Sequence, residues 1–89
     1  MLEHEIEITN KLGLHARAAA KLVKVAGGFS SSIEIEKQEQ RVNAKSIMSV
    51  MMLAASRGNT VKLFVAGDDQ TDALASIVEL IENKFGEDE

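Results

Sequence analysis

The sequence predicts an α+β fold in which three helices cover one face of an open, four-stranded antiparallel sheet. Three observations support this class. Four segments alternate apolar and polar residues with a period of two, three segments repeat their apolar residues at helical spacing, and the order is strand, helix, strand, strand, helix, strand, helix (βαββαβα). Each strand has one apolar face, so the helices should cover one side of the sheet and leave the other to water. With 89 residues, the chain should form a single domain spanning residues 1–89.

The first three elements follow from changes in the hydrophobic period. Residues 2–9 alternate apolar side chains with glutamates and a threonine, which is typical of a half-buried strand. Residues 10–14 contain Gly13 and are predicted to form a turn. Residues 16–26 have helical spacing, and Gly27 with Gly28 should end this helix. One side of this helix is apolar and consists of Ala19, Leu22, Val23 and Ala26. A second side is basic and consists of Arg17, Lys21 and Lys24.

The next two strands are short and close together. Residues 33–36 alternate isoleucine with glutamate, and residues 41–43 form the second of the pair. The polar segment 37–40 between them predicts a hairpin turn. Right-handed crossovers are expected to join parallel strands that are not adjacent in the sheet. An antiparallel strand then lies between them, which gives the split strand-helix-strand arrangement.

The remaining elements complete the sheet and its cover. Ser46 is predicted to be the N-cap of a helix over residues 47–56. Residues 60–66 alternate apolar and polar side chains and are predicted to form a strand. Phe64 does not fit the alternation of this strand, because its ring is predicted to lie on the solvent-exposed face of the sheet. A surface contact or a packed sheet edge would each explain an aromatic ring at that position. Asp69 is placed to cap the last helix. The apolar residues of that helix are Leu74, Ile77, Val78, Ile81 and Phe85.

Composition excludes several classes of function. The chain has no cysteine, which excludes disulfides and thiolate chemistry and fits a reducing cytoplasm. No apolar run approaches the roughly 18 residues of a membrane span, and no basic segment followed by an apolar stretch predicts a signal peptide. The net charge is −4, without a basic patch interleaved with aromatic residues. We therefore expect a cytoplasmic protein that neither inserts into membranes nor binds nucleic acid.

His15 and Arg17 form the main candidate site. His15 lies between the predicted turn at residues 10–14 and the predicted helix at residues 16–26, at the expected N-cap. The first-turn amides, including those of Ala16 and Ala18, have no partners within the helix and carry the positive end of its dipole, so they favour a bound anion such as phosphate. Arg17 adds a planar set of donors that matches phosphate oxygens. A histidine in this setting is a candidate nucleophile for a phosphoryl group.

His15 also has interpretations that involve no phosphoryl group. An isolated histidine near a helix start is often only a polar residue on an exposed turn. His15 has no metal ligand at suitable spacing, and His4 is expected to pack on a strand face, so we expect no metal. No carboxylate lies nearby in sequence to orient the ring as in a hydrolase triad. The chain also lacks nucleotide-binding glycine motifs, and no cofactor is expected.

The predicted second helix is too apolar to bury a single stripe. Ile47, Val50 and Met51 can face the sheet, which leaves Met48 and Met52 partly outside. Methionines adapt to several partners, so these residues could form a docking surface. They could instead form the edge of a broad core stripe, an interpretation that suits Met52 better than Met48, and the pattern alone leaves both open.

Three motifs together resemble one family. The segments Gly13–Arg17 and Asn43–Ile47, with Gly58 after the second helix, are similar to the histidine-containing phosphocarrier (HPr) family of the bacterial phosphoenolpyruvate-dependent phosphotransferase system. The resemblance runs from about Ile6 to Phe85, and the family's open-faced sandwich has the same element order. The stretches that look most like its nitrogen-related or proteobacterial branch are residues 8–11, 51–55 and 85–89. Sugar uptake and nitrogen regulation both remain open as the physiological role.

The resemblance implies a role for each matching residue. His15 would carry a phosphoryl group on Nδ1, received from enzyme I and passed to enzyme IIA domains, and Arg17 would stabilise it. Ser46 matches a position that is phosphorylated in some family members, which would add an HPr kinase/phosphorylase as a partner. Ala18 replaces a proline found in many relatives, which leaves the helix start less rigid. The residues implied to dock partners are Ala20, Lys24, Ile47, Met48 and Met51.

Two functional classes follow from this resemblance. The first is a monomeric carrier that serves as a co-substrate in phosphotransfer rather than as a stand-alone enzyme. It needs no substrate pocket of its own, because its partners complete the active site. The alternative is a regulatory interaction module whose partner binding is switched by phosphorylation at His15 or Ser46.

Overall fold

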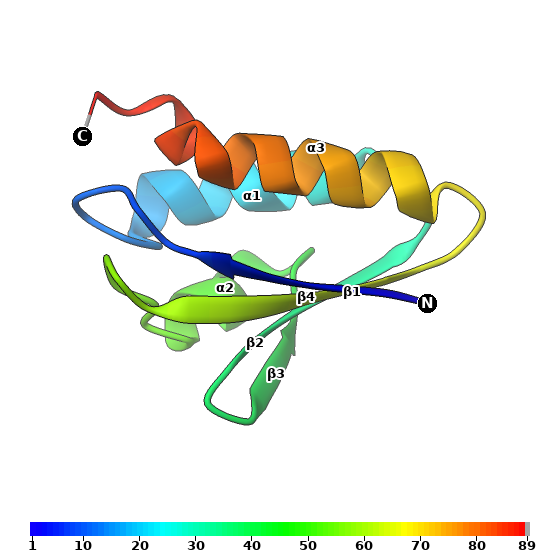
Figure 1. The fold of residues 1–89 in the computed structure, drawn as a ribbon, viewed down its shortest axis with the longest axis horizontal. Coiled ribbons are helices and arrows are strands. Elements are labelled where there is room, and N and C mark those ends of the chain that lie inside the picture. Colours follow the sequence, from blue (N-terminus) through cyan, green and yellow to red (C-terminus); the bar gives the residue numbers. More distant parts are fainter. Residues whose placement is uncertain (89) are drawn as a thin grey trace.

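The computed structural model describes residues 1–88 of the 89-residue chain. Its four strands form one antiparallel sheet in the order β1-β4-β2-β3 (Figure 1). The predicted fold class and element order are confirmed. The elements are β1 (Leu2–Glu7), α1 (Ala16–Gly27), β2 (Ser32–Lys37), β3 (Gln40–Asn43), α2 (Ile47–Met52), β4 (Thr60–Ala66), α3 (Gln70–Glu82) and the short 3-10 helix η1 (Lys84–Gly86).

The helices and the sheet enclose one aliphatic core. α1 and α3 run side by side over the sheet, and α2 packs against α1 and the β3 edge (Figure 1). The strands supply inward-facing residues such as Ile35 and Leu63, and the helices supply Leu22, Ile77 and Ile81, all fully buried. Burying one such side chain contributes about 1.5–3 kcal/mol, so the aliphatic core compensates for the scarcity of aromatic residues.

The first strand is shorter and more exposed than predicted. β1 ends at Glu7 because Ile8 leaves the ladder and pairs with the loop before β4: its amide donates to Asn59 O (2.9 Å), and its carbonyl accepts from Gly58 N (2.8 Å). β1 also forms an edge of the sheet, and His4 is exposed there. The expectation that His4 packs on the strand face was therefore wrong.

The hairpin is tighter than its sequence suggests. β2 and β3 continue to Lys37 and Gln40, which leaves only Gln38 and Glu39 in the turn. Both turn residues are left-handed, with φ of 50° and 69°. Two left-handed residues match the twist of an antiparallel pair, and Asn-Gly is the usual signal for them. The glutamine and glutamate found here gave no such signal.

The second helix ends at Met52 rather than at residue 56. Ala54 is left-handed (φ 51°), and Lys37 Nζ donates to the carbonyls of Leu53 (3.3 Å) and Ala54 (3.0 Å) at the helix end. Ala55 O then accepts from Leu14 N (2.9 Å) in the turn before α1. Contacts with two distant segments thus stop a helix that its own residues would continue.

The predicted inward stripe of this helix was also partly wrong. Val50 and Leu53 are buried, but Ile47 and Met51 are 39% and 40% exposed instead of facing the sheet. Met48 is 69% exposed, and Met52 is similar. The four exposed side chains lie together on a six-residue helix, so the structure favours the interpretation of these methionines as surface residues.

Phe85 reaches the core, as predicted, but not from α3. The helix ends at Glu82, and Lys84 and Phe85 adopt left-handed conformations with φ of 55° and 57°. The ring of Phe85 is fully buried, and its carbonyl accepts from Lys21 Nζ (2.7 Å). This turn directs the C-terminal residues back toward the start of α1 (Figure 1).

Asp69 does not cap α3 with its side chain. It occupies the N-cap position, but its carboxylate accepts hydrogen bonds from the amides of Ser30 and Ser31 (both 2.9 Å) and from Ser31 Oγ (2.5 Å). These hydrogen bonds lower the pKa of Asp69 to about 2, and the bond from the Ser31 hydroxyl contributes most. Asp69 therefore joins the loop after α1 to the loop before α3.

Replacing Asp69 by asparagine should lower stability at neutral pH, with the deficit shrinking in acid. The folded-state pKa lies below the ordinary value of 3.8, so the carboxylate stabilises the fold above that value. This contribution is lost as the pH falls toward about 2. Thermal unfolding of the parent and Asp69→Asn between pH 7 and pH 2 would measure it. A difference in melting temperature independent of pH would contradict this account.

Phe64 is explained by its neighbours on the open face of the sheet. The guanidinium of Arg41 lies 3.6 Å from the centre of the Phe64 ring, and Lys62 Nζ lies 5.5 Å from it. Arg41 also forms ion pairs with Glu34 (3.6 Å) and Glu36 (3.7 Å) on β2. The ring is thus buried beneath long charged side chains, a surface contact of the kind that the sequence left open.

Candidate functional site

His15 occupies the N-cap of α1, as predicted. Its backbone is extended (φ −70°, ψ 175°), and α1 begins at the next residue. The first bond of the helix runs from Ala19 N to His15 O (2.8 Å), so the amides of Ala16, Arg17 and Ala18 precede it. The imidazole makes no capping bond to these amides. They therefore remain available to an anion placed beside the ring.

The turn before α1 is fixed by a buried asparagine. Asn10 is fully buried; its carbonyl accepts from Gly13 N (3.2 Å), and its Nδ2 donates to Gly13 O (2.8 Å). Leu14 N donates to Ala55 O, which ties the turn to the segment after α2. These bonds fix the direction in which the chain enters α1 and therefore the position of His15.

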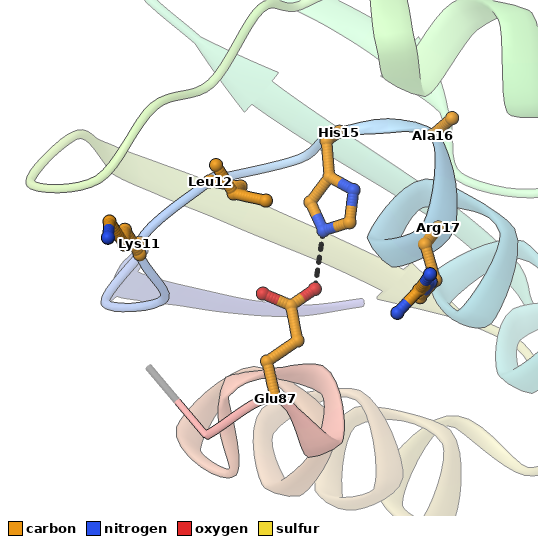
Figure 2. A pocket seen from close by; sticks show the side chains of 6 residues that line it. All are labelled: Lys11, Leu12, His15, Ala16, Arg17 and Glu87. Carbon is orange, nitrogen blue, oxygen red and sulfur yellow. Dashed lines mark hydrogen bonds and ion pairs between the residues drawn. The ribbon is translucent and has the colours of Figure 1, made fainter.

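Glu87 is a member of this site that the sequence did not reveal. Its carboxylate forms a hydrogen bond with His15 Nε2 (Figure 2). The other carboxylate oxygen accepts from Asn10 Nδ2 (3.0 Å). No carboxylate near His15 in sequence can orient its ring, whereas Glu87, 72 residues away in the chain, does contact it. Only the left-handed turn around Phe85 brings it there.

The contacts of Glu87 keep it ionised. The hydrogen bond with His15 is the main reason that the pKa of Glu87 is lowered, and the Asn10 bond and the charges of His15 and Lys21 act in the same direction. Desolvation acts in the opposite direction but is outweighed. At neutral pH Glu87 is therefore a carboxylate, which can only accept hydrogen bonds.

A shallow depression of about 500 Å³ surrounds the histidine. It combines two cations, one carboxylate and the exposed start of α1, and the ring of His15 remains 27% exposed within it. Figure 2 shows Glu87 on the Nε2 side of the ring, while the other ring nitrogen lies on the side of Ala16 and Arg17. The lining residues are Lys11, Leu12, His15, Ala16, Arg17 and Glu87. The depression is open enough for a second protein to reach the ring.

The other predicted residues divide between core and surface. Ala18 is buried, so it can offer an anion only its backbone amide, whereas Ala16 lines the depression. Ser46 caps α2 as predicted, since its Oγ accepts from Ser49 N (3.4 Å). The structure exposes all five predicted docking residues: Ala20, Lys24, Ile47, Met48 and Met51. α1 and α2 contact each other, so these residues lie on neighbouring helices.

Residues 1–88 also bear on metal binding and membrane insertion. Within this range, no group of three or more histidine, cysteine, aspartate or glutamate side chains could hold a metal ion. No helix in the described part of the chain is both long enough and apolar enough to cross a membrane.

Comparisons with known proteins agree on one family. Residues 2–83 match the family model described as "PTS HPr component phosphorylation site". The chain is 51% identical over 88 residues to a phosphocarrier protein HPr of Xylella fastidiosa strain Temecula1, covering 99% of both chains. The crystal structure of HPr-C-His from Thermoanaerobacter tengcongensis is 55% identical and superposes with a TM-score of 0.96, covering all of both chains. A crystal structure of an HPr dimer from the same organism is 56% identical, with a TM-score of 0.79 over 98% of this chain and 100% of that one.

Proposed function

The chain belongs to the HPr family of phosphocarrier proteins of the phosphotransferase system, and on this premise we propose that His15 is the residue that carries the phosphoryl group. The observation that supports this assignment most directly is the position of His15 at the N-cap of α1. There a partly exposed imidazole lies beside three first-turn amides, and Arg17 lines the same depression. These groups suit a dianion bound to the ring.

The transfer requires positioning more than elaborate chemistry. His15 Nδ1 attacks phosphorus in line with the bond to the departing group of the donor, through a loose transition state with charge on the peripheral oxygens. Arg17 and the amides of Ala16 and Ala18 stabilise those oxygens. The donor is enzyme I and the acceptors are enzyme IIA domains. A shallow, open depression suits a monomeric, cytoplasmic carrier that acts as a co-substrate and whose partners complete the active site.

The partners dock on the exposed surface of α1 and α2. Ala20 and Lys24 lie on α1, and Ile47, Met48 and Met51 lie on α2 next to it. The flexible methionines allow one surface to fit several partners.

Ser46 provides a regulatory site at the edge of this surface. A phosphate placed there by an HPr kinase/phosphorylase would suit the start of the helix. It would also add negative charge beside the apolar side chains and weaken the docking of an acidic partner. This charge effect favours a regulatory role as the second candidate function.

Phosphorylation of His15 can be tested directly. Incubation with phosphoenolpyruvate and enzyme I should produce an acid-labile phosphate adduct, and His15→Ala should abolish it. His4→Ala removes the other histidine of the chain, which is exposed on β1, and should leave the adduct unchanged. The adduct can be measured by intact-protein mass spectrometry before and after acid treatment. An acid-stable adduct, or one that persists in His15→Ala, would overturn the assignment.

A further inference from the structure

The hydrogen bond between Glu87 and His15 determines which ring nitrogen can accept a phosphoryl group. An ionised carboxylate can only accept, so the proton of a neutral imidazole must lie on Nε2 when that nitrogen is bonded to Glu87. The lone pair is then on Nδ1. That nitrogen lies on the side of the ring nearer Ala16 and Arg17, where the anion-binding groups are (Figure 2).

The C-terminal segment is built in a way that holds Glu87 in place. Two residues earlier, the Phe85 ring is fully buried, and the Phe85 carbonyl accepts from Lys21 Nζ on α1. Asn10 Nδ2 fixes the second carboxylate oxygen of Glu87 while it also bonds Gly13 O. The same buried amide thus connects the turn that positions His15 to the carboxylate that orients its ring.

We propose that Glu87 is a positioning residue for phosphoryl transfer: it holds the Nε2 proton of His15, directs the Nδ1 lone pair to phosphorus and stabilises the positive charge that the ring acquires. This inference rests on the proposed role of His15 as the phosphoryl carrier. The carboxylate of a Ser-His-Asp triad acts on its histidine in a comparable way, by orienting the ring and stabilising the imidazolium.

The transfer step balances without any proton leaving the ring. The Nδ1 lone pair forms the N–P bond while the bond from phosphorus to the leaving atom of the donor breaks, and that electron pair stays with the donor. Nε2 keeps its proton, so the phosphorylated ring is a cation paired with Glu87. When the group passes to an acceptor, the N–P electron pair returns to Nδ1 and the ring becomes neutral again.

The charges around the ring make this carboxylate effective. Lys11, from the turn, and Arg17, from α1, line the same depression, and Lys21 acts on Glu87 from the next turn of α1. All three are cations and disfavour a positively charged ring. Glu87 is the acidic member of the lining set, and it is in direct contact with the nitrogen that keeps the proton.

The test compares Glu87→Gln with a matched control, Asp88→Asn. Both remove one negative charge, but Asp88 is exposed and lies one residue further along. The rate of phosphorylation by phosphorylated enzyme I should fall about tenfold to a hundredfold in Glu87→Gln, the range expected for a charge-assisted hydrogen bond, and stay unchanged in Asp88→Asn. Thermal unfolding of both variants identifies any loss of folded protein.

A second measurement separates positioning from a structural role. In a ³¹P NMR titration of the phosphorylated protein, the ring should lose its Nε2 proton at a lower pH in Glu87→Gln than in the parent or in Asp88→Asn. Equal rates and equal titrations in all three proteins would overturn the inference. Faster phosphorylation of Glu87→Gln would also overturn it, because Glu87 would then act as a barrier to an incoming anion. If the parent formed no adduct at His15, the proposed function itself would fail.

Discussion

Replacing Arg17 by glutamate is expected to slow phosphorylation of His15 about 10²–10³-fold while leaving stability nearly unchanged. The guanidinium lines the depression beside His15, where charge develops on the transferring group, and removing one such donor typically costs a factor of this size. The variant also places a carboxylate beside an incoming dianion. Arg17 is exposed, and surface substitutions usually change the free energy of unfolding by no more than about 0.5 kcal/mol.

Two further variants identify what Arg17 contributes. Arg17→Lys keeps the charge but loses the planar set of donors, so it should give an intermediate rate. Arg57→Glu makes the same charge reversal at an exposed position after α2 and should transfer at the parental rate. Single-turnover kinetics with phosphorylated enzyme I give the rates, and urea unfolding gives the stabilities. A loss of stability in Arg17→Glu large enough to account for the loss of rate would make Arg17 a structural residue.

The parts of the site that sequence could predict depend on local signals. The change from period two to helical spacing places the start of a helix near Ala16 and therefore His15 at its N-cap, and the structure agrees. The cap of Ser46 and the burial of Phe85 depend on similarly local patterns. In each case the residue types within a few positions carry the information.

The features that were missed depend on contacts between distant segments. α2 stops early because Lys37, on β2, satisfies carbonyls at its end, and no residue within the helix signals this. Phe64 looked misplaced because the side chain that covers it, Arg41, belongs to β3. Glu87 appeared to be only part of an acidic tail. Its position follows from the turn at residues 84–86, where Lys84 and Phe85 are left-handed as well as Gly86. Left-handed conformations at two successive non-glycine residues are not predicted by pattern alone.

Gly13 is a position where we expect a single added methyl group to destabilise the fold strongly. A Cβ at this residue would lie 2.4 Å from Ala55 O and 2.8 Å from Ser56 Cα, and the backbone is left-handed (φ +64°). Both obstructing atoms are backbone, and Leu14 N already binds Ala55 O, so neither can move without breaking that bond. Left-handed strain costs about 1–2 kcal/mol and overpacking about 1–3 kcal/mol. Gly13→Ala should therefore lose about 2–5 kcal/mol of unfolding free energy.

Gly27→Ala is the matched control for this prediction. Gly27 is the last residue of α1, its added Cβ would meet no atom within 4 Å, and alanine is favoured over glycine in a helix by up to about 1 kcal/mol. Urea unfolding should therefore show opposite shifts for the two variants. Because Gly13 lies two residues before His15, the Gly13→Ala protein should also accept phosphoryl groups more slowly even under conditions where it remains folded. Equal stability of the two variants would mean that the turn can shift away from residues 55–56, and the position of His15 would then not depend on that contact.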